Sequence, residues 1–154
     1  SSSEDMRGLV FRALFDEPLV FVVRGGHPLS GGQATLEEAL TFPTLLPPEG
    51  TIIRQELSRY LSGQGVSELP DVVETTSSDF QRSYVARTDC VAVMPRGVVQ
   101  AELESGAFVH LDIAKDAMRG PVGLTTNPEL RLGSGAGKLV ETILNTPLMP
   151  KMVS

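Results

Sequence analysis

Two short segments place hydroxyl groups where an apolar run gives way to a helix-like pattern. Residues 46–51 read Leu-Pro-Pro-Glu-Gly-Thr, and residues 74–80 read Glu-Thr-Thr-Ser-Ser-Asp-Phe. A helix start exposes free backbone N–H groups at the positive end of the helix dipole, and this arrangement suits an anion. These residues therefore favour the binding of a small carboxylate over a catalytic role.

The same residues have a simpler interpretation, because Thr51 and either Ser77 or Ser78 are good N-caps and helices commonly use one. Two observations favour the ligand. Arg54 and Arg82 lie one turn inside the two predicted helices, where they could add charge-assisted hydrogen bonds. In α/β folds, moreover, ligands bind at the carboxyl ends of the strands. Both interpretations stay open on the local sequence.

The residue types that usually perform catalysis give no supported site. His27 precedes a proline in a glycine-rich loop, and we interpret it as a turn residue rather than a base or ligand. His110 lies in a β-like run, which is typical of a half-buried histidine. Cys90 begins an apolar run and is interpreted as a buried thiol. Two isolated histidines do not make a zinc motif, so we predict no metal and no catalytic residue.

A glycine-rich stretch near the end of the chain is similar to a phosphate-binding loop. Residues 133–138 read Gly-Ser-Gly-Ala-Gly-Lys, but Leu139 stands where that motif requires Ser or Thr. We therefore interpret Gly133 and Ser134 as the start of the last helix. We predict no cofactor.

Composition narrows the class of protein. The 154 residues are 41% hydrophobic and 21% charged, enough apolar material for a packed core. The net charge of −6 argues against direct nucleic-acid binding by this chain. No apolar run approaches the roughly 20 residues that a membrane span needs, and the first residues lack the features of a secretory signal. We expect a cytoplasmic protein that does not contact membranes, and the missing initiator Met indicates an excised fragment.

Short β-like runs alternate with helix-like stretches, which predicts an α/β fold with mostly parallel strands. Thr35 and Glu38 have the spacing of a capping box. On the helix after Ser78 we expect Phe80, Tyr84 and Val85 to be buried. The predicted strands are residues 8–14, 18–23, 43–46, 71–75, 90–94, 107–113 and 121–125, and the predicted helices are residues 36–40, 51–62, 78–87, 97–104 and a last one from 134.

The order of several motifs resembles one known family. Residues 15–24, Phe-Asp-Glu-Pro-Leu-Val-Phe-Val-Val-Arg, are followed by His-Pro-Leu at 27–29 and by Thr-Leu-Glu-Glu-Ala-Leu at 35–40. Together with residues 47–54, 73–76 and 89–98, they are similar to the effector-binding domain of LysR-type transcriptional regulators. The resemblance covers about residues 9–145.

That resemblance implies a fold like type II periplasmic binding proteins, with two Rossmann-like lobes and a small-molecule effector between them. It implies a second lobe over residues 24–113 and a partial first lobe over 1–23 and 114–154. The effector-binding residues that it implies are Pro48, Glu49, Gly50, Thr51, Thr76, Ser77, Ser78, Phe80, Val122 and Thr125.

Two parts of the family pattern are absent from this sequence. The winged helix-turn-helix is missing, so DNA contact is expected only through that absent domain. The opening part of the first lobe is missing too, which implies uncovered apolar surface on the last helix and a homo-oligomer. Residues 47–54, 78–85 and 119–125 also resemble a narrower subgroup, which includes the activator of the protocatechuate operon and implies an aromatic-derived carboxylate effector.

Two other functions remain possible on the sequence. One is a periplasmic solute-binding protein of the same fold, which a secretory signal on the parent gene would favour. The other is a small α/β enzyme using Cys90 or His27. The reactivity of Cys90 in the folded protein discriminates the enzyme from the sensor.

Overall fold

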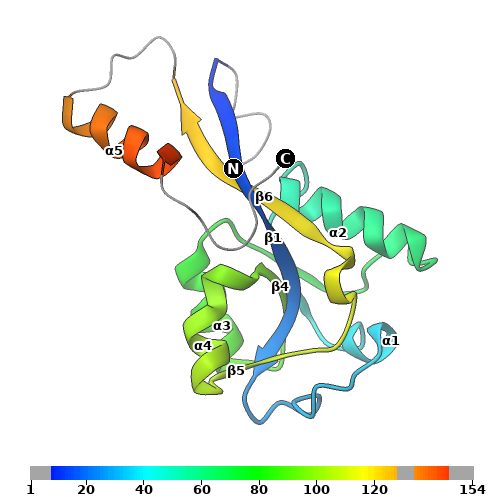
Figure 1. Cartoon of the computed structure of the whole chain (residues 1–154). Helices are drawn as coiled ribbons and strands as arrows, with labels where there is room; N and C mark the ends of the chain where they lie inside the picture. The colour runs from blue at the N-terminus through cyan, green and yellow to red at the C-terminus, as the bar shows by residue number, and fades with distance from the viewer. Residues whose placement is uncertain (1–7, 128–133, 146–154) are drawn as a thin grey trace.

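The structure is a computed structural model that describes residues 8–127 and 134–145. Its centre is β1 (Val10–Arg24), one strand of 15 residues. Residues 19–24 of β1 lie inside the main sheet, whose strand order is β3-β2-β4-β1-β5. Residues 10–18 leave this sheet and pair with β6 (Arg119–Thr126) instead. Figure 1 shows these two strands running together away from the main sheet, and we call this pair the crossing ribbon.

The two strands predicted over residues 8–14 and 18–23 are confirmed as β structure from Val10 onward, but they form one continuous strand rather than two. Pro18, at the start of the second predicted strand, faces Arg119 in the antiparallel register of the ribbon. The strand tolerates the missing N–H there, and the next amide, that of Leu19, donates to Met118 O at 3.1 Å. The ladder is irregular only between Ala13 and Phe15.

The rest of the main sheet is built from short strands. They are β2 (Thr44–Leu46), β3 (Val72–Glu74), β4 (Val91–Pro95) and β5 (Phe108–His110). β2 is parallel to both β3 and β4, as predicted, but β1 is antiparallel to β4, β5 and β6. The expectation of mostly parallel pairing is thus wrong for the central strand, and the fold is a mixed α/β fold.

Helices cover both faces of the main sheet. They are α1 (Leu36–Ala39), α2 (Ile52–Gly63), α3 (Ser78–Arg87) and α4 (Gln100–Ser105), with 3-10 turns η2 (Arg96–Val99) and η3 (Lys115–Ala117). Leu57 and Leu61 of α2 pack on one face with Phe21. Val85 of α3 and Val99 pack on the other. The core therefore lies on both sides of β1 and β4.

The local capping signals are confirmed. Thr35 and Glu38 form the capping box of α1. The Thr51 hydroxyl accepts from the Arg54 N–H at 3.3 Å, and the Ser77 hydroxyl accepts from the Phe80 N–H at 3.1 Å. Residues 97–104, predicted as one helix, begin instead as the 3-10 turn η2 before continuing as α4.

Phe80 corrects the predicted buried face of α3, because it is 46% exposed and stacks on Tyr84 with ring centroids 5.5 Å apart. Residues four apart share a helix face, and the pair that faces the core is Gln81 and Val85. The sequence pattern favoured the aromatic pair, whereas a polar residue occupies the buried position.

The last helix, α5 (Ser134–Asn145), lies apart from the main sheet in Figure 1. Leu139 on its predicted apolar side is 61% exposed. The first residue of the phosphate-loop-like stretch and the predicted end at Pro147 lie outside the described residues. Among the described residues, no helix is long and apolar enough to cross a bilayer.

A glycine in the crossing ribbon provides a test of its tight pairing. A Cβ on Gly123 would collide with the backbone of Arg12 and Ala13, which cannot yield as a side chain can. We expect Gly123→Ala to lower the free energy of unfolding by about 1–3 kcal/mol, as overpacking does. Gly63→Ala is the control, because the space around Gly63 is open and alanine favours a helix. Urea unfolding of both variants measures this, and equal effects would contradict the ribbon geometry.

Candidate functional site

A cleft of about 380 Å³ lies where the crossing ribbon meets the starts of two helices. Its walls come from the strand-to-helix segments before α2 and α3, from the turn after β4, and from both strands of the ribbon. We call it the cleft, and its lining is Phe11, Pro47, Thr51, Ile52, Ile53, Thr75, Thr76, Ser78, Gln81, Val93, Pro95, Val98, Pro121, Val122, Gly123 and Thr125.

Half of the residues predicted for an effector site line this cleft. They come from three separate segments of the chain, and they are Thr51, Thr76, Ser78, Val122 and Thr125. The other half do not line it, namely Pro48, Glu49, Gly50, Ser77 and Phe80. The Ser77 hydroxyl is instead occupied in capping α3, and Glu49 lines a different hollow.

Other lining residues were missed by the sequence reasoning. Phe11 belongs to the crossing ribbon, and Pro95 and Val98 flank the turn after β4. The sequence around these residues indicates only a strand and its end. It does not indicate which other segment these side chains face. Gln81 was missed because the aromatic residue before it dominated the helix pattern.

Backbone and hydroxyl groups supply the hydrogen-bonding capacity of the cleft. Helix geometry leaves the first N–H groups of α2 and α3 without partners inside the helix. Thr51, only 5% exposed, already uses its hydroxyl, which donates to Pro48 O at 2.8 Å while accepting from Arg54 N. Thr51 therefore shapes the helix start, whereas Thr76 and Ser78 present hydroxyls that bond no other described residue.

Gln81 is the most informative polar residue of the cleft. It is only 8% exposed, and its carboxamide makes no hydrogen bond to another described residue. Its polar atoms are not among the fully buried side-chain atoms that lack a partner, so the carboxamide is open to the cleft that Gln81 lines. A group bound in the cleft could therefore exchange hydrogen bonds with it.

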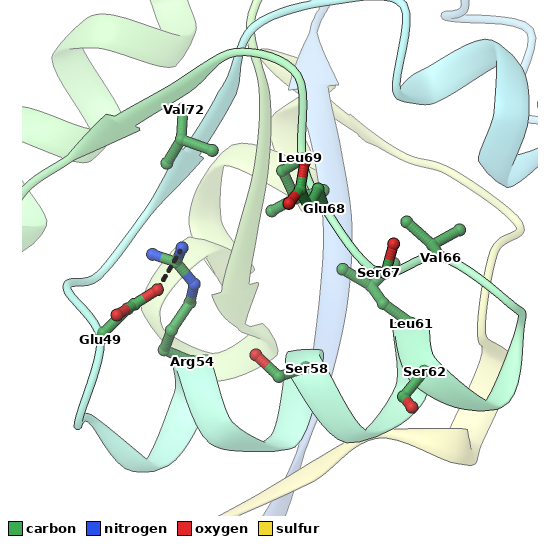
Figure 2. A pocket seen from close by; sticks show the side chains of 10 residues that line it. All are labelled: Glu49, Arg54, Ser58, Leu61, Ser62, Val66, Ser67, Glu68, Leu69 and Val72. Carbon is green, nitrogen blue, oxygen red and sulfur yellow. Dashed lines mark ion pairs between the residues drawn. The ribbon is translucent and has the colours of Figure 1, made fainter.

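The two arginines expected to serve the site point elsewhere. Arg54 lines a second, more polar hollow of about 510 Å³ together with Glu49 and Glu68, as Figure 2 shows. Its guanidinium donates to Glu74 at 3.2 Å and to Pro47 O at 3.1 Å. Arg82 bonds Asp79 at 2.7 Å. No Lys, Arg or His belongs to the lining of the cleft within the described part of the chain.

The histidines have structural positions. His27 is buried and bridges two loops, with Nε2 2.9 Å from Asp89 O and Nδ1 accepting from the Leu29 N–H. Burial and then the charge of Arg96 lower the pKa of His110. Among the described residues, neither histidine is hydrogen-bonded to Cys90, although His27 contacts the neighbouring Asp89. No cluster of metal-binding side chains occurs within residues 8–127 and 134–145.

The reactivity of Cys90 tests this structural interpretation. Cys90 is buried, and burial raises the pKa of its thiol, so little thiolate is present at neutral pH. We expect a thiol reagent such as DTNB to modify it at least about 100-fold more slowly in the folded chain than in guanidinium. Rapid modification of the folded chain would contradict a buried thiol.

The second strand of the ribbon is anchored to α2. Arg59 donates to Glu56 at 2.7 Å and to Ala117 O at 2.8 Å, and Glu56 accepts from the Arg119 N–H at 3.4 Å. The hydrogen bond from Arg59 lowers the pKa of Glu56 below its usual value. The base of β6 is thereby tied to the helix whose start lines the cleft.

This anchor predicts an acid-sensitive contribution to stability. A carboxylate whose pKa is lowered in the folded state stabilises above its unfolded pKa and loses that effect as the pH falls through the folded pKa. We expect Glu56→Gln to lower the Tm at pH 7, with a difference from the unmodified chain that shrinks toward about pH 3. Thermal unfolding across this range measures it, with Glu37→Gln as an exposed control. A constant difference at every pH would contradict the anchor.

The fold is a mixed α/β domain with a candidate ligand site between the main sheet and the crossing ribbon. The sequence profile of the LysR substrate binding domain matches residues 1–147, and the chain belongs to this family of transcription-regulator domains. It is therefore not an enzyme, and the solute-binding alternative is not favoured.

Individual relatives agree with this assignment. The chain is 34% identical over 137 residues to the HTH-type transcriptional regulator PcaQ of Agrobacterium fabrum, covering 86% of this chain and 44% of PcaQ. At this identity, the narrower subgroup resemblance is only weakly supported.

Two solved structures share the fold. The effector binding domain of QuiR in complex with shikimate matches with a TM-score of 0.65 and 16% identity, over 94% of this chain and 68% of that one. The regulatory domain of Synechocystis CcmR in complex with 2-PG matches with a TM-score of 0.64 and 17% identity, over 88% and 65%. The chain spans less than half the length of PcaQ.

Proposed function

We propose that the cleft binds a small, aromatic-derived carboxylate and that its occupancy regulates transcription through a DNA-binding domain outside this chain. The observation that carries the proposal is Gln81, a largely buried residue that lines a cleft between two helix starts and whose carboxamide is open to that cleft, with no partner among the described residues. The structures of QuiR with shikimate and CcmR with 2-PG support a small-molecule effector for domains of this fold.

The chemistry of the lining favours a singly charged ligand with an apolar body. Helix N–H groups and the Ser78 and Gln81 side chains supply donors for one carboxylate. Other parts of the lining are apolar and include Phe11, Val98 and Val122. A multiply charged ligand would lose more hydration free energy than its contacts in the cleft regain, because no cationic side chain lines the cleft within the described residues.

In this proposal the protein has the two lobes that the family resemblance implies. Residues 24–113 form the second lobe, and residues 1–23 and 114–154 belong to the first. The protein acts as a cytoplasmic homo-oligomer, in which the exposed side of α5 is covered. Effector binding shifts the population of lobe angles, for which a coupling of about 1–3 kcal/mol is typical.

The direct test is a thermal-shift panel with benzoate, protocatechuate, shikimate and gluconate. A ligand that binds only the folded chain stabilises it by about 2.7 kcal/mol at a hundredfold excess over its Kd. We expect the aromatic and cyclic carboxylates to raise the Tm and the open-chain gluconate to have a smaller effect.

Matched variants locate the effect. Ser78→Ala combined with Gln81→Met removes two polar groups without touching the caps Thr51 and Ser77, and should weaken binding at least about tenfold. The control is Ser58→Ala combined with Ser62→Ala, which alters the hollow of Figure 2 on another face of α2. The proposal is wrong if no compound raises the Tm, or if both double variants weaken binding equally.

A further inference from the structure

A buried glutamate lies on the crossing ribbon, beside the turn that follows β4. Glu17 belongs to β1 and is only 8% exposed. It faces Gly120 of β6 in the register of the ribbon, so it lies where both crossing strands meet the main sheet. It forms no ion pair with a described residue. Its carboxylate accepts a hydrogen bond from the backbone N–H of Gly97, 80 residues away in the sequence.

Gly97 lies in the first turn of a helical run, where its N–H has no acceptor within the helix. Pro95 is the N-cap of the helical run formed by η2 and α4, and it has no side-chain oxygen with which to cap. The first N–H groups of such a run are unpaired within the helix. Glu17 supplies the missing acceptor from another strand, and its negative charge suits the positive end of the run.

The residue at the contact is suited to this close approach. A Cβ on Gly97 would occupy the position of the Glu17 carboxylate. A side chain at position 97 is therefore incompatible with the hydrogen bond as it stands. Glu17 and Gly97 therefore join the turn to the ribbon part of β1, beside the pairing of Pro95 with Leu19 in the main sheet.

The same turn forms a wall of the cleft. Pro95 and Val98, on either side of the contact, line the cleft. A ligand that displaces this wall therefore pulls on Gly97, and through it on Glu17. Leu19, two residues further along β1, donates its N–H to Met118 O at 3.1 Å, immediately before β6 begins.

We propose that Glu17 is a positioning residue that transmits occupancy of the cleft from the turn at residues 95–98 to the crossing ribbon. The proposal rests on the proposed function, because it describes how the same cleft is read out. Glu17 does not contact the ligand, and the link that it adds is its hydrogen bond to Gly97, beside the pairing of Pro95 with Leu19.

The first measurement is amide hydrogen exchange by NMR on the ¹⁵N-labelled chain. We expect Glu17→Ala to accelerate exchange of the Gly97 amide by roughly five- to tenfold, as loss of a cap does. Glu17→Gln retains an acceptor and should stay closer to the unmodified chain. Glu37→Gln, an exposed glutamate, should leave the Gly97 amide unchanged.

The second measurement tests transmission with a tethered occupant, so that no natural effector is required. Thr76→Cys places a thiol in the cleft, where benzyl methanethiosulfonate adds an aromatic ring, while the buried Cys90 resists the reagent. We expect this adduct to change exchange of the Leu19 amide several-fold in the otherwise unmodified chain and with Glu17→Gln. With Glu17→Ala, the adduct-induced change at Leu19 should be clearly smaller, because only the pairing of Leu19 with Pro95 then joins the turn to β1.

The outcomes separate the two proposals. The transmission proposal is overturned if the adduct changes Leu19 exchange equally with Glu17→Ala, if it changes nothing, or if Glu17→Ala leaves Gly97 exchange unaltered. Gly97→Ala, which breaks the contact from the other side, replaces Glu17→Ala if that variant does not fold. A negative carboxylate panel with a positive adduct result would refute the ligand class alone.

Discussion

The whole arrangement depends on one strand serving two pairings. Residues 19–24 of β1 are fixed between β4 and β5, and residues 10–18 are fixed against β6. Because side chains alternate along a strand, a slip of one residue would reverse every buried side chain in the main sheet. Burial of Leu19 through Val23 on both faces therefore sets the register of the ribbon as well. The same register fixes the position of the ribbon residues in the cleft, since the ribbon forms one of its walls.

Local features of the fold were predictable from the sequence, whereas long-range pairings were not. Capping by Thr35, Thr51 and Ser77 involves neighbours within three residues, so the pattern contains the whole interaction. The continuity of β1 through Pro18 depends on its pairing with β6, about a hundred residues later in the chain. The local sequence around Pro18 contains no information about that pairing. The antiparallel direction of β1 has the same origin, because its partners are distant in the chain.

The candidate site divides in the same way. Thr51 and Ser78 come together in the lining of the cleft because helix starts after parallel strands meet at one sheet edge. Arg54 was expected in the cleft, but Glu74, which follows it by 20 residues, draws its guanidinium into the other hollow. Gln81 was not predicted as a site residue, because the hydrophobic pattern of a helix places apolar residues, not glutamine, on the buried face. Such exceptions are expected where a binding function outweighs local preference.

The two strands of the crossing ribbon are attached to different walls of the cleft. β1 is bonded through Glu17 to the turn that carries Val98, and the base of β6 is bonded through Arg59 to the helix that begins beside Thr51. In the proposed function, a ligand between these walls would bear on both attachments at once, so both strands of the ribbon are coupled to the occupancy of the cleft.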